Sequence, residues 1–187
     1  MNAHLLIREY FEVWVYELSG QNRIFAVSET WDCFADSNDG SLAGSHHVMG
    51  RPIWDFVAGL TTKSFLNAAF FSVRSAHKPI SLFHRCDSPL ERRHFKMLIE
   101  PLDAGGLRVS HVQIDAVQHQ SATYTPQLRD DMVCCSQCLR WRLSSVWEEL
   151  DIHIAYVRTP VEFNVCPQCR SDALRAIDKI LARSPRY

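Results

Sequence analysis

The chain has 187 residues, 47% of them hydrophobic and 22% charged, which is enough ordinary globular sequence for one good core and a small appendage. Its formal net charge of −1 lacks the basic excess of a dedicated nucleic-acid-binding protein. No apolar run approaches the roughly 20 residues that cross a bilayer, and the first nine residues do not resemble a secretory signal. We therefore expect a cytoplasmic protein with no membrane contact.

The first strands and helices follow from the alternation of residue types near the N-terminus. Residues 12–19 alternate and are rich in β-type side chains, and a Ser-Gly-Gln-Asn turn leads to a second run at 23–27, which predicts a hairpin. Ser28 can cap a helix through Ala35 that ends in the breaker cluster 37–40. After a second break, Pro52 is suited to be the first residue of a short helix.

A longer helix and three further strands complete the expected first domain. Thr61 or Thr62 can cap a helix that continues to Ala76. Three β-type runs, at 80–86, 93–102 and 106–117, follow with short turns between them, so consecutive strands should pair antiparallel.

The rest of the chain predicts a linker and a second unit. Residues 118–131 lose apolar density and gain Ser, Thr, Pro and Gln. Residues 132–187 should form a small unit with a helix around 144–156 and a final helix around 171–182.

Two C-x-x-C pairs stand in this second unit, Cys135 with Cys138 and Cys166 with Cys169, with 27 residues between the pairs. Zinc prefers tetrahedral thiolate coordination, and each pair can supply two sulfurs from one tight turn. Four protein ligands leave no position for water, so we predict a structural zinc ion and not a catalytic one. Cys134 as a ligand would give a C-x-x-x-C spacing, so Cys135 is preferred.

Other uses of these cysteines stay open. The same four residues can hold an iron–sulfur cluster, and the pairs can also be free thiols, reversible disulfides or a redox motif. An extracellular disulfide framework is not favoured, because the seven cysteines are an odd number and four of them cluster late in the chain.

In the order of its elements, the first domain resembles a PAS domain. The likeness rests on the hairpin, the helix at 28–35, the stretch Met-Gly-Arg-Pro-Ile-Trp-Asp-Phe at 49–56, the long helix and the three-strand meander. The stretch 83–93 is similar to one in bacterial single-PAS proteins. The tail resembles one that follows PAS or receiver domains, through its four cysteines, Trp147 and Glu149. That tail often has His-Gly before its second pair, whereas Phe163-Asn164-Val165 stands here.

The resemblance implies an α+β fold: a PAS-like five-stranded antiparallel sheet flanked by helices, plus a C-terminal zinc-knuckle unit. It implies a sensor domain at 12–117, a linker at 118–131 and the four-cysteine unit at 132–187. Residues 1–11 would form an N-terminal helix at a dimer contact. Such proteins act in bacterial signal transduction, and because this sequence shows no output segment, the output would pass through a protein partner.

Strand parity suggests where a sensor pocket would lie. If the inner face of the sheet includes His84 and Cys86, a polar spot stands among apolar walls, as in small-ligand sites. The candidate pocket residues are His84, Cys86, Phe95, Met97 and His111. The alternative is a packed core whose hydrogen bonds are satisfied. The pocket ligand is not identified by the sequence: flavin is disfavoured because neither Cys33 nor Cys86 lies in the expected helix motif, and haem stays open because nine histidines are present.

Three functions compete at this stage. The first is a non-enzymatic sensory or regulatory protein whose zinc unit binds a partner or a second copy. The second is nucleic-acid binding through residues 132–187, which carry eight Lys and Arg against six Asp and Glu. The third is a haem- or small-ligand-binding PAS sensor. No catalytic triad, P-loop or H-E-x-x-H motif supports an enzyme.

Overall fold

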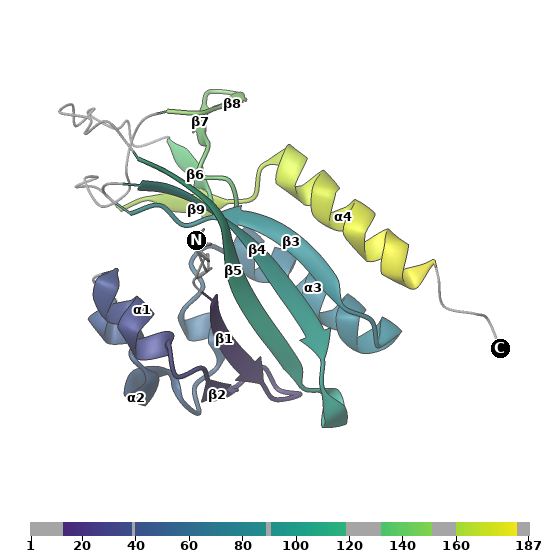
Figure 1. Ribbon diagram of the computed structural model, residues 1–187. Coiled ribbons are helices and arrows are strands. Elements are labelled where there is room, and N and C mark those ends of the chain that lie inside the picture. Colours follow the sequence, from purple (N-terminus) through teal and green to yellow (C-terminus); the bar gives the residue numbers. More distant parts are fainter. Residues whose placement is uncertain (1–12, 39, 89–90, 119–131, 151–159, 183–187) are drawn as a thin grey trace, which may run out of the picture.

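A five-stranded antiparallel sheet forms the centre of the molecule (Figure 1). The computed structural model describes residues 13–38, 40–88, 91–118, 132–150 and 160–182. The strands pair in the order β2-β1-β5-β4-β3, and every pairing is antiparallel. Their bounds are β1 Val13–Leu18, β2 Ile24–Val27, β3 Ile80–Arg85, β4 Glu91–Pro101 and β5 Leu107–Gln118. The α+β class and the five-stranded antiparallel sheet are therefore confirmed.

The helices of the first domain lie between β2 and β3 in the chain. They are α1 Trp31–Ser37, α2 Ser45–Val48 and α3 Leu60–Ala76, with short 3-10 turns at Ser41–Ala43, Ile53–Asp55 and, between β4 and β5, Asp103–Gly105. Helix α3 buries one side against the sheet through Leu66, Phe70 and Val73. The sheet contributes alternate residues to the same core, as period-two side-chain alternation requires. None of the described helices is long and apolar enough to cross a bilayer.

A second, smaller sheet and the last helix follow. The strands β6 Val133–Cys135, β7 Trp141–Leu143, β8 Val146–Glu148 and β9 Glu162–Asn164 pair in the order β8-β7-β6-β9, with β9 parallel to β6. Helix α4, Pro167–Leu181, runs beside β3, the edge strand of the large sheet (Figure 1). Its Ala173 and Ile177 are buried in the same core cluster as Leu66 and Phe70. The C-terminal unit thus shares a core with the first domain and covers a sheet edge that would otherwise expose unpaired backbone groups.

Three expected helix starts are wrong. The helix expected from Ser28 begins at Trp31, and Ser28 Oγ instead accepts a hydrogen bond from Val15 N at 3.1 Å. Helix α3 begins at Leu60 after Gly59, so neither Thr61 nor Thr62 caps it. Residues after Pro52 form only a 3-10 turn that begins at Ile53.

The expected helix at 144–156 is also wrong in its described part, because residues 141–148 form the β7–β8 hairpin. The left-handed backbone of Ser144, with φ of 54°, makes the tight turn, and Val146 and Trp147 are residue types that favour strands. Residues 151–156 of that prediction lie outside the described residues, as do the N-terminal helix expected at 1–11 and all but the first residue of the linker expected at 118–131. The last helix begins at Pro167, earlier than expected, because proline suits the first helical turn.

Gly59 is a point of close contact between the second unit and the start of α3. Its φ is +80°, and a Cβ added there would lie 2.5 Å from the carbonyl oxygen of Phe163 on β9. Only glycine satisfies both the left-handed backbone and this close approach.

We expect Gly59→Ala to lower the free energy of unfolding by more than about 3 kcal/mol, because it adds a steric clash to backbone strain. Gly50 is a matched control: its φ is +78°, but an added Cβ meets nothing within 4 Å. Gly50→Ala should therefore cost only about 1 kcal/mol, the strain alone. Urea unfolding of both variants measures the difference, and equal losses would contradict the close approach.

Candidate metal centre

The two cysteine pairs are brought together by a strand, a turn and a helix start. Cys135 ends β6, and a tight turn to Cys138 is closed by Leu139 N donating to Cys135 O at 2.9 Å. Cys166 follows β9 and is the N-cap residue of α4, which places Cys169 in the first helical turn. Because β9 pairs in parallel with β6, both pairs emerge at the same end of the small sheet.

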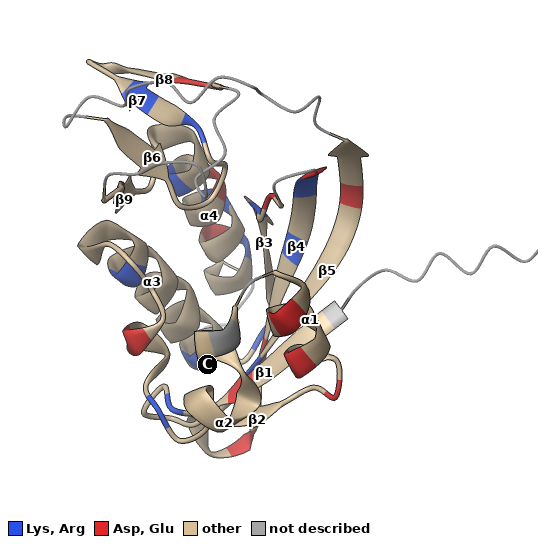
Figure 2. Ribbon diagram, turned by 90° about the vertical axis from the view of Figure 1, so that its left-hand side faces the viewer, with Lys and Arg blue, Asp and Glu red and all other residues tan. Residues whose placement is uncertain are grey.

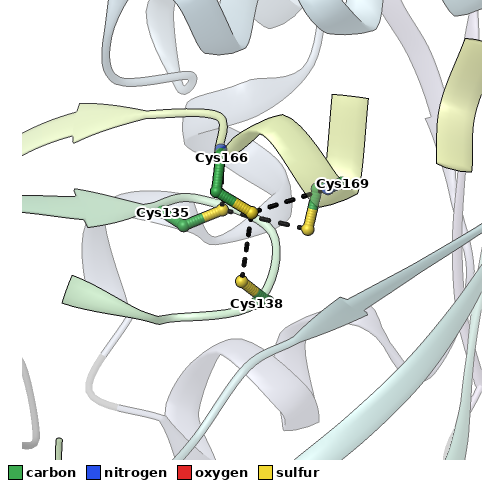
Figure 3. A group of neighbouring side chains, drawn as sticks. All are labelled: Cys135, Cys138, Cys166 and Cys169. Atoms are coloured by element: carbon green, nitrogen blue, oxygen red, sulfur yellow. Dashed lines mark hydrogen bonds between the residues drawn. The ribbon is translucent and has the colours of Figure 1, made fainter. Parts of the chain in front are cut away.

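The four sulfur atoms point toward one another (Figure 3). All lie within 4.8 Å of one another, with 4.0 Å between Cys135 and Cys169 and 3.7 Å between Cys138 and Cys166. A tetrahedral zinc ion with Zn–S bonds of about 2.3 Å requires sulfur separations of about 3.8 Å. The cluster therefore fits a metal ion bound by four thiolates.

Backbone amides and neighbouring thiols favour one negative charge on this cluster, at Cys135. Cys166 N donates to Cys135 Sγ at 3.4 Å, and Cys169 N donates to Cys166 Sγ at 3.5 Å. Hydrogen bonds from the thiols of Cys138 and Cys169 lower the pKa of Cys135. The same shared hydrogen bonds raise the pKa of Cys138 and that of Cys169, since a second negative charge so close is unfavourable. A divalent cation would remove this penalty, so metal binding should release protons.

Cys134 is placed differently from its neighbour. Its side chain is fully buried, it is not among the four converging thiols, and burial raises its pKa to about 12. It therefore behaves as a small apolar residue under the sheet. The structure separates Cys134 from the cluster and places Cys135 in it.

The first turn of the metal centre is hydrogen-bonded to the large sheet. Arg85 N, at the end of β3, donates to Gln137 O at 2.7 Å, and Thr62 Oγ1 on α3 donates to Ser136 Oγ at 2.9 Å. The Arg85 side chain, only 9% exposed, forms an ion pair with buried Asp87 and donates to Cys138 O at 3.3 Å.

Glu149, just after β8, extends this network. Its Oε1 accepts from Arg85 at 3.0 Å and from Arg92 at 2.6 Å. The turn between Cys135 and Cys138 is thus held by backbone, hydroxyl and charged contacts to α3 and β3. Sequence reasoning missed this role of Arg85, because its partners Gln137, Cys138 and Glu149 stand more than 50 positions away in the chain.

The five candidate pocket residues lie on or beside the inner face of the sheet. Register pairs His84 with Phe95 across β3 and β4, and Met97 with His111 across β4 and β5. Phe95, Met97 and His111 are buried. Cys86 follows the end of β3, and its carbonyl accepts from Arg93 Nε at 2.8 Å.

Two of these residues bond directly to each other. His84 Nε2 and His111 Nδ1 are 2.8 Å apart, His84 stacks on Phe95, and His111 stacks on Trp14 at a ring-centroid distance of 5.0 Å. Burial lowers the pKa of His84 to about 4 and holds that of His111 well below its usual range, where the neighbouring His84 lowers it further. Both rings are therefore neutral near pH 7.

A scan against protein-family models found no family that matches the chain, and a search of curated proteins found no significant relative.

Alanine substitutions at Cys134 and at Cys135 distinguish a metal ligand from a packed core residue. We expect the wild type and Cys134→Ala to keep one tightly bound metal ion per chain after dialysis against EDTA. Cys135→Ala should lose it, because three thiolates leave the shell open. Elemental analysis by mass spectrometry gives the stoichiometry, and metal loss in Cys134→Ala alone would show that the wrong cysteine has been placed in the site.

The histidine pair predicts a pH dependence of stability. Since both folded pKa values are depressed, the unfolded chain binds more protons below about pH 6.5, so stability is complete above that pH and falls as the pH drops toward 4. From pH 7.5 to pH 5 each histidine should cost about 2 kcal/mol.

A matched pair of variants isolates this contribution. His84→Gln/His111→Gln should show a flatter dependence of the urea-unfolding free energy on pH than wild type, whereas His47→Gln, at an exposed position, should not. Parallel curves for the double variant and wild type would contradict the assignment.

Proposed function

We propose that this chain is a non-enzymatic sensory or regulatory protein of bacterial signal transduction. In this proposal a PAS-like domain receives the signal, and a structural zinc unit presents a surface to a protein partner or to a second copy. The chain forms a hairpin, then helices, then a three-strand meander, and the hairpin and the meander join in one sheet. This is the order of elements in a PAS domain, which supports the first half of the proposal.

The observation that carries the proposal is the way the metal centre is built into the fold. Its four cysteine ligands would fill a tetrahedral shell and leave no open position for water, which suits a structural ion. The helix that starts at Cys166 buries Ala173 and Ile177 in the shared core. Zinc at this place would hold α4 against β3 and fix the outer face of that helix.

That outer face of α4 has the character of an association surface. Leu174 and Leu181, seven residues apart and therefore on one side of the helix, are 53% and 44% exposed. Exposed charged residues, among them Arg170 and Asp178, lie around them. Exposed leucines among charged residues on one helix face are a pattern by which helices bind protein partners.

The two alternative functions have weaker support. Basic and acidic residues are interspersed along α4 (Figure 2), and Arg175 is paired with Asp172, so the helix has no basic stripe for phosphates. Haem ligation by His84 through Nε2 or by His111 through Nδ1 would require their mutual hydrogen bond to break. Iron–sulfur ligation by the four cysteines stays open, and optical absorption of the purified protein distinguishes it from zinc.

Charge placed on the outer face of α4 tests the partner surface. We expect Leu174→Asp to abolish association with the partner, or dimerisation, without loss of metal or melting temperature, because Leu174 is already half exposed. Leu42→Asp, at a position 79% exposed in the 3-10 turn Ser41–Ala43, is the matched control.

The measurements are quantitative affinity purification from the host cell and light scattering of the purified chain. Proteins retained by wild type and by Leu42→Asp but lost with Leu174→Asp would support the proposal. An unchanged set of bound proteins and an unchanged mass for all three would contradict it.

A further inference from the structure

Gln137 is a buried side chain whose acceptor atom has no partner. The residue is 5% exposed, and its Oε1 lacks a hydrogen bond within the described part of the chain. An unpaired buried amide oxygen lowers the stability of the folded chain, so its presence needs a physical reason. Gln137 lies between the ligands Cys135 and Cys138, and it lines a cleft of about 540 Å³. That volume is in the range of small-molecule sites.

The cleft lies between the metal unit and the end of the large sheet. Phe83, Phe95 and Ile114 from β3, β4 and β5 supply apolar walls. The side of the cleft that the metal unit forms is lined by residues of the first cysteine turn, by the residue that follows β8 and by residues of α4: Gln137, Cys138, Arg140, Glu149, Gln168, Cys169 and Asp172. Phe83 and Ile114 are 65% and 45% exposed, so large apolar surfaces remain open to solvent here. His84 and Phe95 of the candidate inner-face pocket also line it, whereas Cys86, Met97 and His111 do not, so the cleft and the candidate pocket overlap only in part.

Acidic residues outnumber basic ones in the lining of the cleft, with Asp115, Glu149 and Asp172 against Arg85 and Arg140. Arg85 is already engaged by Asp87 and Glu149. On the acceptor side stand Gln137 Oε1, the half-buried sulfurs of Cys138 and Cys169, and the carboxylate of Asp115, which is 60% exposed and 3.8 Å from His94. Metal-bound thiolates carry negative charge and accept hydrogen bonds. Arg140 is a second cation on the cleft wall and opposes this trend.

We propose that this cleft binds a small organic cation, an ammonium group on an apolar, aromatic body. The ring lies against Phe83 and Ile114, and the buried Gln137 side chain turns toward the cleft so that its Oε1 accepts from the ammonium N–H. This inference rests on the proposed sensory function and deepens it, because such a ligand bridges β3 and the first cysteine turn. Its occupancy would strengthen the contact between the sheet and the metal unit.

A matched pair of probes tests the charge preference. 2-Phenylethylammonium and 3-phenylpropionate have similar size and opposite charge, and each is titrated into the metal-loaded full-length chain by calorimetry and by amide NMR. The cation should bind at least tenfold more tightly and shift the amide signals of residues 83–85, 114 and 137–138. Equal or weaker affinity for the cation, or shifts elsewhere, would overturn the proposal.

Two substitutions separate binding from folding. Gln137→Met keeps the length of the side chain and removes the unpaired oxygen, so the melting temperature should stay or rise while affinity for the cation falls at least tenfold. Phe83→Ala should also weaken binding, and Phe71→Ala, at a position 69% exposed on α3, should not. A Gln137→Met protein that melts lower and binds the cation normally would show that the residue is structural.

The same samples distinguish failure of this inference from failure of the proposed function. If the chain holds one metal ion and Leu174→Asp loses the partner, but the cleft does not prefer the cation, the proposed function stands and the cation site is wrong. A chain that prefers the cation but has no partner or second copy would retain the cleft as a site and reject the signalling role.

Discussion

The convergence of four thiols is the constraint on which the C-terminal half of the structure depends. The two C-x-x-C turns have 27 residues between them in the chain, and their sulfurs meet within 4.8 Å. Without a cation, so many thiols cannot all ionise together, as the opposed pKa shifts of Cys135 and Cys169 indicate. With a divalent metal ion the cluster becomes a cross-link that joins β6 to the start of α4, and the binding free energy becomes folding free energy.

This cross-link acts on the whole molecule because the metal unit is not a separate appendage. Arg85 connects the first cysteine turn to the end of β3 through both its backbone N–H and its side chain. Gly59 lets β9 approach the start of α3 so closely that no other residue would fit. Ile177 then joins the core of the large sheet. Loss of the metal should therefore loosen the packing of α4 against α3 and β3, and not only the small sheet.

Two sites near the end of β3, the pair of His84 and His111 and the cleft beside Gln137, differ in their exposure and in what they can respond to. The pair His84 and His111 is enclosed, stacked on aromatic rings and neutral, so it resists protonation until the pH is low. The cleft beside Gln137 is open and keeps an unpaired acceptor. His84 lines the cleft and also bonds to His111, so it connects the two places through a single side chain.

Local sequence patterns were sufficient for the strands of the large sheet, for the antiparallel pairing of consecutive strands and for the four cysteines that converge, because alternation and C-x-x-C spacing are properties of neighbouring residues. The pairing of β1 with β5 was expected only from the resemblance to a PAS domain. They failed at the helix expected over 144–156, because the left-handed backbone of Ser144 and the pairing of β7 with β6 favour a hairpin there. They also missed the roles of Arg85 and Gln137. Those roles exist only because the tertiary fold brings residues more than 50 positions apart into contact, and no local pattern records which distant partner a side chain will meet.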